Sequence, residues 1–335
     1  MATDGLRAAV VGVGRLGSAH ARVYSELPGC RLVAVADSDI ERAREVAAPY
    51  GAESFASAEE IPEVDAVSVV TPTTSHRSVA EIFLSRGVAT LVEKPMTKTV
   101  AEAEELIAIA ESSGAPLQIG HIERFNPALM AAMPGMGRPL FIECRRISPF
   151  PFRSSDVGVV LDVMIHDIDI ILHLAESEVV DVAASGAAVL SKTEDVANAR
   201  LVFASGLVAD VTASRVSMKS ERKLRVFGKA FYLSLDLMNR GGVLYRPTEK
   251  LLSGAVDIES MGPGDVADPK GFVFQDLISV EQIAGDDREP LAAELESFLA
   301  AAKGESPPVV GGRHGLAAMR TAEAIVQAVA EGAKR

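Results

Sequence analysis

The sequence predicts an α/β protein, in which an N-terminal doubly wound parallel sheet is followed by an α+β domain with a large, open and mostly antiparallel sheet. Strand-like and helix-like stretches alternate over residues 1–124, which is typical of a parallel sheet covered by helices. Strand-like stretches then follow one another through much of residues 125–335. We therefore expect two domains, 1–124 and 125–335.

In the first domain, short apolar runs predict strands and amphipathic stretches predict helices. The expected strands are 6–11, 31–36, 66–71, 89–93 and 117–120, and the expected helices are 16–26, 40–50, 79–86 and 99–113. Ser38 or Asp39 is available to cap the second helix. Thr99 and Glu102 form a capping box, and Gly114 suits the left-handed residue after the fourth helix.

The second domain is expected to contain seven strands and a helical insertion over 157–175. The strands are 139–147, 179–190, 197–203, 207–214, 222–227, 231–236 and 241–245. Residues 253–270 are rich in Gly, Asp and Pro and predict a loop. Helices are expected over 290–303 and 316–330.

Composition limits the classes of function. The chain has 335 residues, 48% hydrophobic and 24% charged, with a formal net charge of −13. This acidity argues against nucleic acid, because a phosphate backbone needs clustered Lys and Arg. Two cysteines imply no disulfide framework, and we see neither a signal peptide nor a membrane span. We expect a cytoplasmic protein without a metal that binds a small molecule.

The turn from Gly12 to Gly17 has the pattern G-x-G-x-x-G between the first strand and the first helix. Gly12 permits the tight turn, Gly14 the approach of a pyrophosphate, and Gly17 close packing of the helix. Asp37 ends the second strand, 20 residues after Gly17, where a carboxylate can accept hydrogen bonds from a ribose. The alternative is a turn that uses glycine only for packing.

Several residues that could bind a ligand follow the predicted strands of the first domain. Ligands of doubly wound sheets bind beyond the carboxyl ends of the strands, so we expect these residues to line one crevice. They are Gly12, Asp37, Thr71, Glu93-Lys94-Pro95 and His121. A partly desolvated Lys94 could polarise a hydroxyl or carbonyl oxygen, although a Lys-Pro pair in isolation is usually a surface turn.

The helix expected over 157–175 carries four ionisable residues on an otherwise apolar sequence. At 3.6 residues per turn, Asp162, His166, Asp169 and His173 fall on one stripe. A buried carboxylate beside a histidine can orient and tune a general base. Two alternatives are a metal site that uses Asp162, His166 and a further ligand, and a polar network with a structural role.

Together these motifs resemble the Gfo/Idh/MocA family of sugar and polyol oxidoreductases over nearly the whole chain. The matching features are Gly12-x-Gly14-x-x-Gly17, Glu93-Lys94-Pro95, Gly120-His121-x-x-Arg124-Phe125-Asn126-Pro127 and Asp162-x-x-x-His166-x-x-Asp169. The resemblance implies an N-terminal Rossmann domain and a second domain whose open sheet often forms a homodimer or homotetramer. It also implies Lys94, Asp162 and His166 as catalytic residues. Many members have two or three glycines shortly before the Asp, whereas here only Gly158 remains.

The resemblance implies NAD as the cofactor and hydride transfer from a secondary hydroxyl. The expected cofactor contacts are Gly12, Gly14, Arg15, Leu16, Gly17, Asp37, Thr71, Pro72, His76, Glu93 and Lys94. Asp37 favours NAD over NADP, because its carboxylate would repel a 2′-phosphate. The next two residues, Ser38 and Asp39, provide no positive charge to compensate. His166 is the expected base with Asp162 orienting it and Lys94 stabilising the alkoxide, but Lys94 could itself be the base.

The stretch from His121 to Pro127 resembles nucleotide-sugar members, including UDP-N-acetylglucosamine 3-dehydrogenases. Expected substrate contacts are Lys94, His121, Arg124, Asn126, Arg153, Asp162 and His166. Arg124, Arg145, Arg146 and Arg153 could bind a diphosphate, or they could form ordinary salt bridges. An inositol-type polyol dehydrogenase is the alternative enzyme. A module that senses NAD(H) without turnover is less consistent with the three catalytic residues, and so is a biliverdin-reductase-like enzyme.

Overall fold

The computed structural model describes residues 5–152, 157–262 and 264–332. Residues up to 125, together with 288–323, form one compact unit, and residues 126–287 with those from 324 onward form a second. The sequence suggested instead that everything after 124 forms one domain. The segment 288–323 returns to the first unit because Leu295 and Phe298 are buried in that unit's core.

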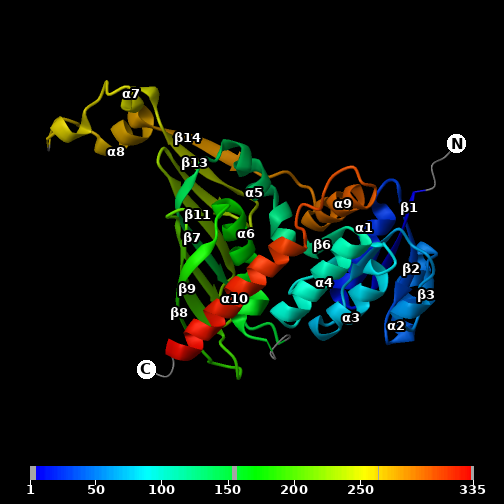
Figure 1. Ribbon diagram of the computed structural model, residues 1–335. Helices are drawn as coiled ribbons and strands as arrows, with labels where there is room; N and C mark the ends of the chain where they lie inside the picture. The colour runs from blue at the N-terminus through cyan, green and yellow to red at the C-terminus, as the bar shows by residue number, and fades with distance from the viewer. Residues whose placement is uncertain (1–4, 153–156, 263, 333–335) are drawn as a thin grey trace. The chain divides into compact units, whose positions relative to one another are not determined.

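The sheet of the first unit has six strands in the order β3-β2-β1-β4-β5-β6. Every neighbouring pair is parallel (Figure 1). This order and direction are those of a Rossmann fold, which confirms the predicted fold class. The strands are β1 (Leu6–Val11), β2 (Cys30–Ala36), β3 (Glu53–Phe55), β4 (Ala66–Val69), β5 (Ala89–Glu93) and β6 (Leu117–Gly120). The short edge strand β3 was not predicted.

Helices cover both faces of this sheet. The core on one face is formed with α1, α2 and α9, and the core on the other with α3 and α4. The helices are α1 (Arg15–Glu26), α2 (Ile40–Ala47), α3 (Thr73–Leu84), α4 (Val100–Ser113), α9 (Pro290–Ala302) and α10 (Gly312–Gly332), and α10 ends in the second unit. The predicted caps are confirmed: Asp39 caps α2, Thr99 and Glu102 form the capping box of α4, and Gly114 is left-handed.

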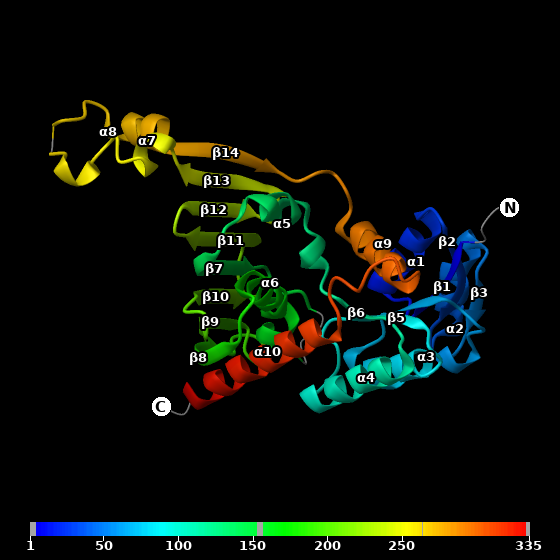
Figure 2. The same ribbon diagram turned by 45° about the horizontal axis from the view of Figure 1, so that its top comes forward.

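The sheet of the second unit has eight strands in the order β14-β13-β12-β11-β7-β10-β9-β8 (Figure 2). All neighbouring pairs are antiparallel except β7 and β10, which are parallel. The strands are β7 (Pro139–Ile147), β8 (Val179–Ala187), β9 (Val196–Phe203), β10 (Val208–Ser214), β11 (Glu221–Gly228), β12 (Phe231–Asp236), β13 (Gly241–Pro247) and β14 (Ile278–Ala284). The edge strand β14 was missed; most of its residues are exposed, and the alternation of apolar and polar residues breaks after Glu281.

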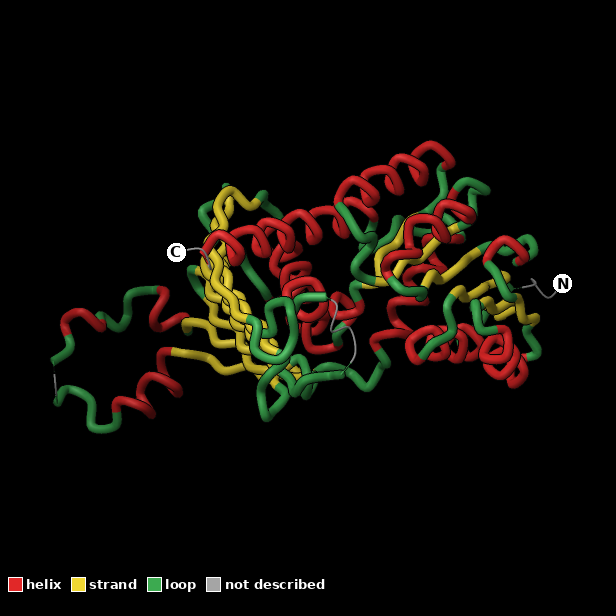
Figure 3. The backbone as a smooth tube through the Cα atoms, turned by 90° about the horizontal axis from the view of Figure 1, so that it is seen from below, coloured by secondary structure: helices red, strands yellow, loops and turns green. Residues whose placement is uncertain are grey.

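One face of this second sheet is buried. Alternate residues of its strands, such as Ile142 and Cys144 of β7 and Leu224 and Val226 of β11, point into a core covered by α5 (Pro127–Ala132) and α6 (Ile165–Ala175). The segment between β13 and β14 extends beyond the ends of these strands (Figure 3). It contains the short helices α7 (Glu249–Leu252), η6 (Ile258–Ser260), α8 (Pro269–Gly271) and η7 (Phe272–Leu277). Among the described helices, none is long and apolar enough to cross a membrane.

Candidate functional site

The residues expected at the carboxyl edge of the first sheet do follow its strands. Gly12 follows β1, Asp37 follows β2, Lys94 follows β5 and His121 follows β6, while Thr71 comes two residues after β4. These strands are neighbours in one parallel sheet, so the five residues are at the same edge of the first unit. In a doubly wound sheet this edge is where ligands bind.

The three glycines of the turn have distinct geometries. Gly12 has φ +86°, and a Cβ there would lie 2.7 Å from the backbone of Val70 and Thr71. A Cβ at Gly17 would collide with the carbonyl oxygen of Gly12, so this position requires the smallest residue. A Cβ at Gly14 would meet no atom within 4 Å, which leaves the backbone open to a ligand.

These residues fit a dinucleotide. Helix α1 begins at Arg15 without a side-chain cap, so its first N–H groups and its positive dipole end can receive a phosphate. The hydroxyl of Thr71 is buried and has no hydrogen-bond partner among the described residues, so it can bond to a ligand. Leu16 is 44% exposed in the first turn of α1, next to the open approach at Gly14.

Asp37 is tied to the glycine turn. Its carboxylate accepts the N–H of Val13 at 2.9 Å and that of Asp39 at 3.0 Å. A guanidinium nitrogen of Arg42 lies 3.5 Å from Asp37, and Arg42 also bonds to Asp39 at 3.0 Å. Sequence reasoning considered only the two positions after Asp37 and missed Arg42, which the first turn of α2 brings back to the strand end.

Lys94 stands in a turn fixed by buried polar groups. The carboxylate of Glu93 accepts the N–H of Lys94 at 3.2 Å, and it lies 3.2 Å from Nε2 of His20 on α1. His76 contacts the carbonyl oxygens of Thr71 at 2.8 Å and of Pro95 at 2.9 Å. Helix α3 was expected to begin near residue 79, but it begins at Thr73, and this places His76 in its first turn. His20 was not predicted to take part.

The stretch after β6 is buried in the first unit. His121 is 1% exposed and Arg124 is 7% exposed, and the N–H of Arg124 donates to the carbonyl of His121 at 3.0 Å. Asn126 begins the second unit, where it caps α5 through the N–H of Ala128 and donates to the carbonyl of Leu237 at 3.0 Å. These contacts give Asn126 a structural role. Arg153 lies outside the described residues.

In the second unit, Asp162 and His166 lie in two different kinds of helix. Residues Val160–Met164 (η5) form a π-helical turn, in which the N–H of Ile165 donates to the carbonyl of Val160, and α6 begins only at Ile165. The stripe predicted from 3.6 residues per turn is therefore not regular through Asp162. Asp169 is buried, while Asp162, His166 and His173 are half-buried. Single π turns are frequent at functional sites.

A buried ion pair lies beneath α6. Arg146 on β7 bonds to Asp167 through Nε at 3.1 Å and through Nη2 at 2.7 Å, and both side chains are almost fully buried. Arg145 pairs with Glu221 at 3.7 Å. The salt-bridge interpretation thus holds for Arg145 and Arg146. Asp167 was not predicted, because pairing with a residue on a distant strand leaves no local pattern.

The start of η5 is held by a second buried pair. Arg215 bonds to Asp195 at 2.8 Å and to the carbonyl of Val157 at 2.7 Å, while Glu194 accepts the N–H of Val160 at 3.2 Å. A Cβ at Gly158 would collide with the carboxylate of Glu194, so a larger residue there would displace this side chain. Burial raises the pKa of Asp195, but three backbone N–H groups and the hydroxyl of Ser191 outweigh it, so this pKa lies below its usual value.

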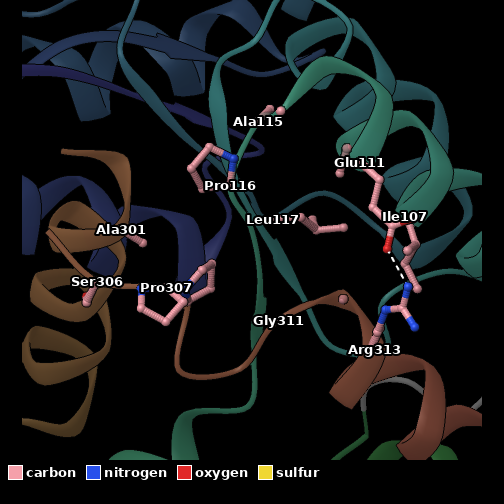
Figure 4. A pocket seen from close by; sticks show the side chains of 14 residues that line it. Ile107, Glu111, Ala115, Pro116, Leu117, Ala301, Ser306, Pro307, Gly311 and Arg313 are labelled. Carbon is pink, nitrogen blue, oxygen red and sulfur yellow. Dashed lines mark hydrogen bonds and ion pairs between the residues drawn. The ribbon is translucent and has the colours of Figure 1, made fainter. Parts of the chain in front are cut away.

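A pocket of about 430 Å³ in the first unit lies away from the carboxyl edge of its sheet (Figure 4). It is lined by Leu117 at the beginning of β6 and by the segment 306–313, and an ion pair between Glu111 and Arg313 crosses its rim. Within the described part of the chain, no group of three or more His, Cys, Asp or Glu residues is placed to hold a metal ion.

Known proteins place the chain in a family. Residues 6–121 match the model of an oxidoreductase family with an NAD-binding Rossmann fold, and residues 135–233 match the GFO/IDH/MocA C-terminal domain. UDP-N-acetylglucosamine 3-dehydrogenase from Acidithiobacillus ferrooxidans is 38% identical over 96% of this chain and 98% of its own length. Its solved structure has a TM-score of 0.86 at 36% identity and covers 99% of both chains.

Inositol 2-dehydrogenase from Rhizobium meliloti is 28% identical over 97% of both chains. A structure described as a putative myo-inositol dehydrogenase from Sinorhizobium meliloti has a TM-score of 0.77 at 27% identity and covers 98% of both chains. These matches and the NAD-binding geometry of the first unit agree with one another. The chain belongs to the Gfo/Idh/MocA family of NAD-dependent oxidoreductases.

Proposed function

We propose that this protein is an NAD-dependent dehydrogenase that oxidises the 3-hydroxyl of UDP-N-acetylglucosamine to a ketone. The observation that carries the proposal is the 38% identity, over 96% of the chain, with an enzyme named for that reaction. The geometry of each unit supports it, because a dinucleotide cradle and a fixed lysine occur in the first and a half-buried Asp and His in the second.

The cofactor would be held at the carboxyl edge of the first sheet. The N–H groups of Arg15 and Leu16 at the start of α1 would bind the pyrophosphate, and Gly14 leaves room for it. Asp37 would accept hydrogen bonds from the adenosine ribose, and Thr71, Pro72 and His76 would line the next strand end. When bound, NAD supplies the acceptor for the hydride that leaves the sugar carbon.

The proton of the hydroxyl needs a base. We propose His166 for this role, with Asp162 orienting it and the ammonium of Lys94 stabilising the negative charge that develops on the oxygen. In the reverse assignment Lys94 accepts the proton and His166 donates a hydrogen bond. The two assignments differ in the pH dependence of kcat after each residue is replaced.

Arg124, His121 and Arg153 are the proposed contacts to the polar groups of the substrate. A bidentate guanidinium matches a diphosphate, and Arg124 is held by its burial rather than exposed on the surface. We do not extend this role to Arg145 and Arg146, which pair with carboxylates of their own unit. Asn126 would contribute by fixing the start of α5.

A polyol dehydrogenase of the inositol type is the second candidate, because an inositol 2-dehydrogenase is 28% identical over 97% of both chains. Purified protein should be incubated with NAD and with UDP-N-acetylglucosamine, UDP-glucose, free N-acetylglucosamine or myo-inositol in parallel. We expect NADH to form with UDP-N-acetylglucosamine, together with a product lighter by two hydrogens. Faster turnover of myo-inositol would favour the second candidate instead.

We also propose a cytoplasmic homodimer or homotetramer that associates through the second sheet. The face of this sheet opposite α6 carries a row of half-buried rings, in which Phe227 stacks on Tyr232 with 4.5 Å between centroids and Tyr232 on Tyr245 with 5.2 Å. Tyr and Phe are enriched at protein–protein interfaces relative to the rest of the surface. Light scattering after gel filtration should give a molar mass that is a multiple of the 35.3 kDa of one chain. The Tyr232→Asp variant should have a lower molar mass.

A further inference from the structure

The turn that carries Lys94 contains a buried histidine that the proposed mechanism does not use. His20 lies on α1, three residues after Gly17, and its side chain is fully buried. A polar ring in such a place is costly unless it is hydrogen-bonded. Its Nε2 lies 3.2 Å from a carboxylate oxygen of Glu93, the last residue of β5.

The proton of His20 can be assigned from its surroundings. Nδ1 is buried and has no hydrogen-bond partner among the described residues, so a proton there would be an unsatisfied buried donor. A single proton on Nε2 avoids that cost and donates to Glu93. Burial raises the pKa of Glu93, but the hydrogen bond with His20, followed by the charge and the backbone N–H of Lys94, outweighs it and holds this pKa below its usual value.

Glu93 also contacts the main chain of Lys94. Its second carboxylate oxygen accepts the N–H of Lys94 at 3.2 Å. The carboxylate also packs over Gly120 on the neighbouring strand β6, where a Cβ would come within 2.8 Å of it. Glu93 is therefore held from one side by α1 and from another by β6.

We propose that His20 is a positioning residue for Lys94, because through Glu93 it fixes the main chain from which Lys94 reaches the reacting oxygen. The inference rests on the proposed function of Lys94. His20 belongs to the helix whose first turn would bind the pyrophosphate, so the contact joins the cofactor helix directly to the Lys94 turn. A group held only by its own backbone would be placed less accurately, and small displacements of a catalytic group cost rate.

The donor at Nε2 can be kept or removed by substitution. The side-chain nitrogen of Gln is three bonds from Cβ, as is Nε2 of His, so His20→Gln retains a donor to Glu93, whereas His20→Leu removes it. We expect His20→Leu to lower kcat about 10- to 100-fold while KM and NADH affinity change less than about threefold. His20→Gln should stay within about threefold of the wild-type kcat.

A second measurement needs no substrate. Amide hydrogen exchange at Lys94, followed by mass spectrometry, should become at least about tenfold faster in His20→Leu and remain near the wild-type rate in His20→Gln. If His20→Leu does not fold, His20→Asn replaces it, because its amide lies at the position of Nδ1 and cannot reach Glu93.

Equal losses of kcat in the Gln and Leu variants would overturn the inference, and so would unchanged exchange at Lys94 in the Leu variant. If the wild-type protein oxidises none of the sugars, the proposed function fails instead. The exchange rates then still decide whether His20 positions Lys94.

Discussion

The two units hold their candidate catalytic residues in different ways. In the first, Lys94 lies at the end of a buried parallel strand, and its main-chain N–H donates to Glu93, which contacts the buried His20. In the second, Asp162 and His166 lie on a π turn and a helix that two buried ion pairs support, Arg146–Asp167 and Arg215–Asp195. The candidate residues of both units could be predicted from local sequence, whereas the distant partners that support them could not.

The largest expected effects come from the catalytic residues themselves. Lys94→Ala and His166→Ala should each lower kcat by about 10²- to 10⁴-fold, because each removes a proton-transfer or charge-stabilising group from the transition state. NADH affinity, measured by the fluorescence of the bound cofactor, should stay nearly unchanged. Full turnover in both variants would refute the assignment to Lys94 and His166.

Breaking the support of the second site should cost stability. Arg215→Met leaves the carboxylate of Asp195 buried without its cation, so we expect about 3–5 kcal/mol less free energy of unfolding. Urea unfolding followed by circular dichroism measures this. The control is Arg313→Ala, which breaks the exposed pair with Glu111 and should change stability by less than about 1 kcal/mol. Equal effects of the two changes would mean that the buried pair does not support the second unit.

The difference between local motifs and distant partners explains which parts of the molecule could be predicted from the sequence. The parallel sheet, the glycine turn, Asp37 and the Lys94 turn follow from strand–turn–helix patterns within short windows, and the structure shows the last three at one edge of this sheet. The partners Asp167 and His20 are separated from Arg146 and Glu93 by 21 and 73 residues, so they leave no local pattern. The π turn at Asp162 was missed because the periodicity test assumes 3.6 residues per turn.

Edge strands and returning segments were missed for related reasons. Most residues of β14 are exposed, and its apolar and polar residues stop alternating after Glu281, so the pattern of a half-buried strand is short. The segment 288–323 joins the first unit through apolar residues of α9 that would suit any core. Only the three-dimensional structure shows which core they enter.

A smaller effect concerns the choice of cofactor. Asp37→Ser removes the carboxylate that would repel a 2′-phosphate and releases Arg42 from its contact at 3.5 Å. We expect the affinity for NADH to fall about tenfold, which corresponds to about 1.4 kcal/mol of binding free energy. The affinity for NADPH should rise. Fluorescence titration with both cofactors measures the ratio. An unchanged preference for NADH would show that Asp37 does not select the cofactor.

The last prediction compares the reaction rates of one thiol from each unit, Cys30 and Cys144. Burial raises the pKa of Cys30 to about 12 and raises that of Cys144 well above its usual value. A raised pKa lowers the thiolate fraction at pH 8, so both should react with iodoacetamide far more slowly than in urea. The rate for Cys30 should increase with pH, and Cys144, the more buried of the two, should react more slowly. Faster reaction of Cys144 would indicate that the second unit opens more readily.

The most direct test of the proposed reaction follows the hydride itself. UDP-N-acetylglucosamine that carries deuterium at C3 should be incubated with NAD and the protein, and the reduced cofactor analysed by mass spectrometry. We predict that the deuterium appears in NADH from the C3-labelled sugar and not from sugars labelled at C2 or C4. Reduction of NAD without label from C3, or no reduction at all, would contradict the proposed oxidation of the 3-hydroxyl.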